Sequence, residues 1–78
     1  MWQETKNGLH KAFSFKDFKQ AFAFMEQVAL VAEKQKHHPL WINQYNRLEI
    51  WLSTHEADGK ITDKDRKLAK VIDKLNQP

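Results

Sequence analysis

The chain contains no cysteine, so it can form neither a disulfide framework nor a zinc site built from thiolate ligands, and its residue usage gives no indication of secretion. It also lacks a long apolar run. The most apolar stretch, residues 21–32, is interrupted by Glu26 and Gln27, which argues against a membrane span and against a signal-peptide core. We therefore expect a cytoplasmic protein with no membrane partner.

Nucleophiles and strongly charged segments are also scarce. Ser14 and Ser53 are the only serines, and no glycine-rich loop could bind a phosphate, so covalent catalysis and nucleotide chemistry have weak support. The net charge of +3 is mild and acidic residues are interspersed with the lysines, so we do not expect a nucleic-acid partner. The three tryptophans, at positions 2, 41 and 51, could stack on a flat ligand, although large aromatic residues more often lie in cores or interfaces.

A length of 78 residues predicts a single domain, residues 1–78, with one small core. Asn7-Gly8 is a strong hairpin signal, because both residues tolerate a positive φ, and residues 9–15 then alternate in polarity as a half-buried strand does. A second hairpin is expected over residues 40–55, with its turn near residues 45–47. Leu48, Ile50 and Leu52 form one face of its second strand, and strand parity places His55 on the side of Trp51. The side on which Trp41 and Tyr45 lie depends on the turn length, which the sequence leaves open.

Two helices complete the pattern. Asp17 and Gln20 resemble a capping box at the start of the first helix, which continues to about residue 35. Its apolar stripe, expected to face the sheet, consists of Phe18, Ala21, Phe22, Met25, Val28, Ala29 and Ala32. Other apolar residues, Phe24, Leu30 and Val31, fall off this stripe and suggest either a wide core face or a subunit contact.

Thr62 and Asp65 give a second capping pattern, before a closing helix whose apolar stripe consists of Ile61, Leu68, Ala69, Ile72 and Leu75 and which frays at residues 76–78. The element order is then ββαββα. The predicted fold class is α+β: a four-stranded antiparallel sheet with the helices packed on one face.

Three of the four histidines lie in one spaced motif: Glu33, three residues, His37-His38-Pro39, five residues, Tyr45, nine residues, His55. Histidine exchanges protons near neutral pH, so three histidines beside a carboxylate could perform acid and base chemistry. The plainer interpretation is a histidine pair at a helix-to-strand junction with one ring in solvent. Pairing of the two strands of the second hairpin would bring His55 close to the pair. His10, in the first hairpin, is expected to be a surface residue.

Together with this motif, a larger set of residues resembles the pterin-4a-carbinolamine dehydratase family. The likeness extends from about residue 13 to residue 75, which is nearly the whole chain. The matching residues are Val28, Ala29, Ala32, Glu33, His37, His38, Pro39, Leu40, Trp41, Tyr45, Asn46, Arg47, Ser53, Thr54, His55, Glu56, Gly59, Thr62, Asp65, Leu68, Ala69 and Ile72.

The resemblance implies a dehydratase, a hydro-lyase that removes water from 4a-hydroxytetrahydrobiopterin to give quinonoid dihydrobiopterin. This step recycles tetrahydrobiopterin after aromatic amino-acid hydroxylation and needs no metal and no cofactor. By similarity, His37, His38 and His55 match the active-site histidines. Our hypothesis is that His37 and His55 carry the acid and base work while His38 mainly holds the pterin.

The resemblance also implies a supporting set around these histidines. Glu33 matches the acidic position of the family pattern, Trp41 and Tyr45 match its aromatic positions, and Thr54 and Glu56 are further candidates for substrate binding or support. The expected partners are a small pterin substrate, further copies of the chain in a dimer or tetramer, and a pathway containing an aromatic amino-acid hydroxylase. Two departures from the family pattern are evident: the helix that commonly precedes the first strand is missing, and residues 56–59 differ from the acidic, paired-glycine loop of many relatives.

Two other functions remain open. Three histidines with Glu33 could complete a zinc or iron shell, although consecutive histidines on extended chain diverge and the usual ligand spacings are absent. Alternatively, the chain is a non-catalytic interaction or assembly module, as in relatives that serve as coactivators of a homeodomain transcription factor. Phe24, Leu30, Val31 and an unpaired sheet edge would then supply the contacts.

Overall fold

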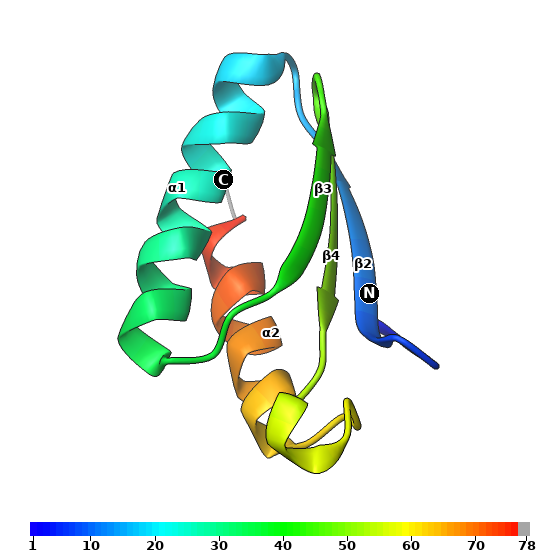
Figure 1. Cartoon of the computed structure of the whole chain (residues 1–78). Coiled ribbons are helices and arrows are strands. Elements are labelled where there is room, and N and C mark those ends of the chain that lie inside the picture. Colours follow the sequence, from blue (N-terminus) through cyan, green and yellow to red (C-terminus); the bar gives the residue numbers. More distant parts are fainter. Residues whose placement is uncertain (77–78) are drawn as a thin grey trace.

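The structure is a computed structural model that describes residues 1–76. The elements follow in the order β1 (Gln3–Thr5), β2 (Gly8–Ser14), α1 (Phe18–Gln35), β3 (Leu40–Gln44), β4 (Arg47–Leu52), a short 3₁₀ helix η1 (His55–Ala57) and α2 (Asp63–Leu75). The strands form one antiparallel sheet in the order β1-β2-β4-β3. Both helices lie on the same side of this sheet (Figure 1), which confirms the predicted fold class and element order.

The core lies between the sheet and the helices. Leu48, Ile50 and Leu52 of β4 are fully buried and face Leu68 and Ile72 of α2 in one cluster. This burial supplies the main driving force for folding, because each such side chain contributes about 1.5–3 kcal/mol when it leaves water. No helix in the described part of the chain combines the length and hydrophobicity that a membrane crossing needs.

The predicted apolar stripe of α1 is partly wrong. The residues that α1 buries are Ala21, Phe24, Val28 and Ala32, so Phe24 belongs to the core. Phe18 and Phe22 are instead 46% exposed and stack on each other with ring centroids 5.6 Å apart. Apolar residues occur around most of this helix, and the rings of Phe13 and Phe15, each 5.2 Å from Phe24, fix which face turns inward.

The turn of the second hairpin contains two residues, Tyr45 and Asn46, and it settles the register that the sequence left open. Gln44 pairs with Arg47, and Trp41 therefore lies opposite Ile50. Directly opposed residues share a sheet face, so Trp41 lies on the helix-facing side, where it packs against the core.

Polar contacts attach the N-terminal segment and β2 to α2. The indole Nε1 of Trp2 donates to Oδ1 of Asp73 at 3.0 Å, and Nζ of Lys11 contacts the same oxygen at 2.8 Å. Lys11 lies opposite Ile50 and so on the helix-facing side of the sheet, and this ion pair satisfies its charge there. Asp73 thereby joins α2 to β2 and to the segment that precedes β1.

Candidate active site

The C-terminus of α1 positions the histidine pair. Lys36 adopts a left-handed conformation, with φ of 54°, and its backbone N–H donates to the carbonyl of Glu33 at 3.1 Å. The N–H of His37 donates to the carbonyl of Ala32 at 3.0 Å, so the chain reverses against the helix end in the manner of a helix C-cap. This reversal turns His37 inward, where it is only 8% exposed.

A buried carboxylate holds the ring of His37. Oδ1 of Asp65, in the first turn of α2, lies 2.5 Å from Nε2 of His37. Oδ2 of Asp65 accepts from the hydroxyl of Thr54 at 2.8 Å and from the backbone N–H of Thr62 at 2.9 Å. Asp65 is fully buried, and its carboxylate therefore joins the end of α1, the segment after β4 and the start of α2.

This contact fixes the proton arrangement of the imidazole. An ionised carboxylate can only accept, so Nε2 of His37 carries the hydrogen and, in the neutral ring, Nδ1 is the free acceptor. His37 can therefore accept a proton at Nδ1 and return it, with its ring orientation fixed by Asp65.

His38 and Glu33 form a second histidine–carboxylate pair. Nε2 of His38 lies 2.9 Å from Oε1 of Glu33, five residues earlier, because the chain reverses at Lys36. Both side chains are largely exposed, at 62% and 75%. His38 and His37 thus diverge, as expected for consecutive residues before a proline: one ring is solvated and the other buried.

The segment after β4 presents His55 at the same end of the molecule. The alternation of buried and exposed residues along β4 continues through Thr54, which is buried. His55 is exposed and begins η1, so the 3₁₀ turn sets the position of His55, and the alternation of the strand does not. Thr54 anchors this loop: its N–H donates to the carbonyl of Lys60 at 2.9 Å and its carbonyl accepts from Gly59 at 3.0 Å. Since the Thr54 hydroxyl also binds Asp65, His55 is one residue from the network that holds His37.

Glu56 is the neighbouring acid on this loop and is fully exposed. A hydrogen bond from its own backbone amide lowers the pKa of its carboxyl below the usual 4.5, and the positive charge of Lys64 lowers it further. The charges that His55 and His37 carry when protonated act in the same direction. Glu56 is therefore ionised near neutral pH.

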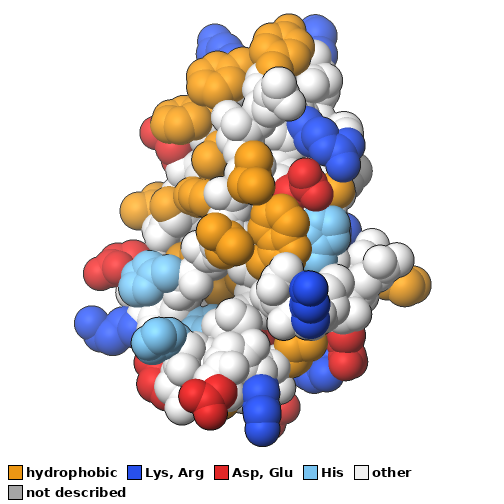
Figure 2. Space-filling model, turned by 45° about the vertical axis from the view of Figure 1, so that its right-hand side comes forward, with side chains coloured by type: hydrophobic (Ala, Val, Ile, Leu, Met, Phe, Trp, Pro, Cys, Tyr) orange, Lys and Arg blue, Asp and Glu red, His pale blue; other side chains and the backbone are white. Residues whose placement is uncertain are grey.

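The structure brings most of the predicted site residues together. Glu33, His37 and His38 lie at the end of α1, β3 begins beside them, and Leu40 pairs with Trp51 near the end of β4, so the segment 54–56 lies at the same corner. Histidine side chains gather near the lower end of the molecule in Figure 2. Tyr45 is not part of this group, because it lies at the tip of the β3–β4 hairpin and is 63% exposed.

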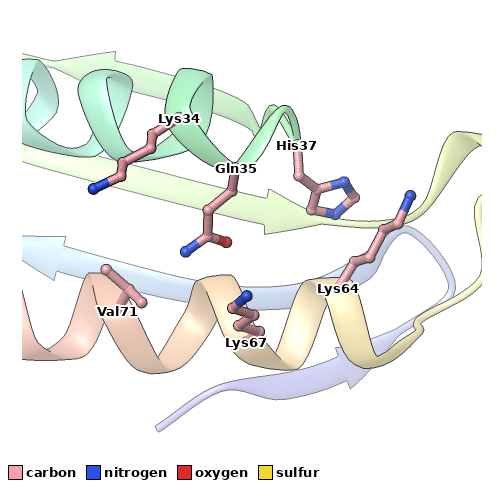
Figure 3. Close-up of a pocket in the computed structure, with 6 residues that line it drawn as sticks. All are labelled: Lys34, Gln35, His37, Lys64, Lys67 and Val71. Carbon is pink, nitrogen blue, oxygen red and sulfur yellow. The ribbon is translucent and has the colours of Figure 1, made fainter.

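A cavity of about 570 Å³ adjoins His37 on the helix side. Figure 3 shows Lys34 and Gln35 of α1 facing Lys67 and Val71 of α2, with His37 and Lys64 at one end. Its volume lies within the range of about 300–1,000 Å³ that is usual for small-molecule sites. Within residues 1–76, no group of three or more His, Asp or Glu side chains is arranged to hold a metal ion.

The sequence motif does not include Asp65 among the site residues. The sequence predicts its capping role with Thr62, and the structure confirms the capping box. Its contact with His37 spans 28 positions and leaves no local pattern. The sequence does contain one signal. Asp65 lies three and four residues before Leu68 and Ala69, so it falls on the apolar face of the helix, where a buried acidic side chain needs a hydrogen-bonding partner.

Solved structures share this fold. A transcriptional coactivator/pterin dehydratase from Brucella melitensis superposes with a TM-score of 0.90 and 41% identity, covering 97% of this chain and 82% of that one. A pterin dehydratase-like protein identified as a RuBisCO assembly factor in the alpha-carboxysome gives a TM-score of 0.80 and 25% identity, over 95% of this chain and 87% of its own.

Sequence relatives give the family. A protein of Christiangramia forsetii is 50% identical over 74 residues, 95% of this chain and 75% of the relative, and one of Rhodospirillum rubrum is 51% identical over 71 residues, 91% and 73%. Both are named "Putative pterin-4-alpha-carbinolamine dehydratase". The family model described as Pterin 4 alpha carbinolamine dehydratase matches residues 1–75, and the chain belongs to this family.

Proposed function

We propose that the protein is a 4a-hydroxytetrahydropterin dehydratase that uses histidine acid and base catalysis. The observation that carries this proposal is the ring of His37, buried beside a cavity and held through Nε2 by Asp65. The family of the chain and the names of its relatives support the same reaction.

The reaction requires two proton transfers. A base removes the proton from N5 of the pterin while an acid protonates the 4a-hydroxyl, the C4a–O bond breaks, and water and the quinonoid dihydropterin result. Nδ1 of His37 is free to exchange one of these protons, and the exposed ring of His55 is the partner for the other. His38, paired with Glu33 in solvent at the same end of α1, binds the pterin in this proposal.

A stopped-flow assay of 4a-hydroxytetrahydropterin loss tests the proposal. His37→Ala and His55→Ala should each lower the catalysed rate by about 10²- to 10⁴-fold, which is the usual contribution of a positioned proton-transfer group. His10→Ala is the matched control and should leave the catalysed rate unchanged. His10 lies on the open face of the sheet, where Nε2 contacts Oε1 of Glu49 at 3.0 Å.

Full activity in both site variants would refute the catalytic assignment. Metal analysis and assay after chelation separate this site from a metal site, since a proton-transfer site keeps its activity.

A second function, as an interaction or assembly module, is favoured by the exposed apolar residues on α1. Phe18, Phe22 and Leu30 are 46%, 46% and 73% exposed. Such a surface fits contact with another copy of the chain, and a dimer or tetramer is the assembly we propose. The edge strands β1 and β3 offer a further contact, through strand pairing with another copy of the chain. The coactivator and assembly-factor titles of the two solved relatives fit the same idea.

A further inference from the structure

The cavity between α1 and α2 has an unusual chemical lining. Three of its lining residues are lysines, Lys34, Lys64 and Lys67, and none of its lining residues is acidic. No carboxylate of residues 1–76 lies within 4 Å of any of these three ammonium groups. Glu56 acts on the charge of Lys64 at longer range, and Asp63, one helical turn before Lys67, lines a separate pocket with it.

The polar groups around the cavity are mostly hydrogen-bond donors. Each ammonium group donates three hydrogen bonds and accepts none, and the Gln35 side chain adds an amide N–H₂. Lys34 and Lys67 come from different helices and extend toward the same groove in Figure 3. Such a lining is complementary to a ligand that only accepts and carries negative charge, which would also relieve the mutual repulsion of the lysines.

We propose that this groove binds an anionic group, a phosphate or a carboxylate. His37 closes one end of the groove, so the anion lies close to the proposed catalytic ring. The anion is either the charged tail of the pterin substrate or a free anion. Only the first of these two sources rests on the proposed dehydratase function.

The first experiment titrates the full-length protein with inorganic phosphate at constant ionic strength and follows backbone amide shifts by NMR. Saturable shifts are expected at Gln35, Lys64 and Lys67. Lys34→Gln combined with Lys67→Gln should weaken phosphate binding about tenfold, as expected from the loss of two solvent-exposed charge contacts.

The matched control removes the same charge from the same two helices. Lys19→Gln combined with Lys74→Gln should change phosphate binding by less than about twofold, since neither residue lines this groove and Lys74 lies seven positions along α2 from Lys67, about 10 Å. Circular dichroism checks that both double variants fold. Shifts that rise linearly without saturation, or an equal loss in the two double variants, would overturn the proposed site and indicate a general charge effect.

The second experiment identifies the source of the anion. The ratio of kcat/KM for a phosphorylated pterin to kcat/KM for a neutral pterin should fall about tenfold in the Lys34, Lys67 double variant if the anion is the substrate tail. An unchanged ratio together with saturable phosphate binding supports the site and assigns it to a free anion. If neither pterin is dehydrated, the proposed function fails, while the phosphate titration still decides the anion site.

Discussion

The carboxylate of Asp65 accepts hydrogen bonds from three separate segments of the chain, through His37, Thr54 and Thr62. An asparagine in its place can keep Thr54 and Thr62 on its amide oxygen, but its amide N–H₂ then faces Nε2 of His37, which can accept only if the ring's hydrogen moves to Nδ1. We expect Asp65→Asn to lower the free energy of unfolding by about 1.5–3 kcal/mol, the usual contribution of hydrogen bonds to a charged group. Urea unfolding at pH 7 measures this change.

Asp63→Asn provides the control for this prediction. Asp63 lies in the same first turn of α2 but is exposed, so the loss of its charge should cost no more than about 0.3–1 kcal/mol through the helix dipole. Equal destabilisation by the two substitutions would contradict the role of the buried network.

Glu56 should impart a pH dependence to stability. Its folded-state pKa lies below the unfolded value, because the backbone hydrogen bond and then Lys64 favour the ionised form. Its contribution to stability is therefore present above pH 4.5 and is lost as the pH falls through the folded-state pKa. Glu56→Gln should lower Tm slightly at pH 7, and the difference from the wild type should vanish in acid.

Differential scanning calorimetry between pH 3 and 7 measures both proteins. A Tm difference that is the same at every pH would show that Glu56 acts through packing and not through its charge.

At the scale of single elements, the β1–β2 turn depends on Gly8. Gly8 has φ of 116°, and a Cβ placed on it would clash with the backbone oxygen of Leu52 on β4. Gly59 also has positive φ, 76°, but a Cβ there would meet nothing within 4 Å. Gly8→Ala should therefore cost more than the roughly 1–2 kcal/mol that a left-handed conformation alone costs a residue with a Cβ, whereas Gly59→Ala should cost about that amount.

Chemical denaturation of the two glycine variants separates the clash from the backbone conformation. Equal losses of stability would mean that the strand beside Gly8 moves to accommodate a methyl group.

The sequence predicts these elements well because their signals are local. Asn7-Gly8, the Asp17 cap and the Thr62–Asp65 capping box each act within four residues, and the structure has all three features. Local signals do not specify which face of α1 is buried, because apolar residues surround the helix. Packing against distant parts of the chain selects the buried face. That is why Phe24 is buried and Phe22 is not.

The candidate site also has a part that local signals predict and a part that they do not. The spacing of the histidines predicts acid and base chemistry, and the pairing of β3 with β4 predicts that His55 lies close to His37 and His38. The hydrogen bond between Asp65 and His37 depends on how α2 packs against α1, and no spacing in the sequence specifies that packing. The position of Tyr45 depends on the two-residue turn, a register choice that the alternating pattern alone does not make.

At the scale of the whole molecule, the exposed apolar residues of α1 predict self-association. Light scattering at micromolar concentration should give a mass above the 9.3 kDa of one chain. Phe22→Glu should shift the mass toward the monomer, because a charge in a desolvated apolar contact is costly. Gln27→Glu adds the same charge to an exposed polar position of the same helix and should leave the mass unchanged.

A monomeric wild-type protein would contradict this prediction. It would leave the dehydratase proposal intact, since the histidines and Asp65 come from one chain.

The attachment of Trp2 to Asp73 makes the indole an optical reporter of one end of the fold. Trp2 lies against the last turns of α2, with its ring 6.0 Å from that of Phe13, whereas Trp41 and Trp51 lie on β3 and β4. In a protein whose other two tryptophans are replaced by phenylalanine, its fluorescence would follow the packing of the C-terminal helix and β2 around the indole. Undocking of this helix would expose the indole to water and shift its emission to longer wavelength.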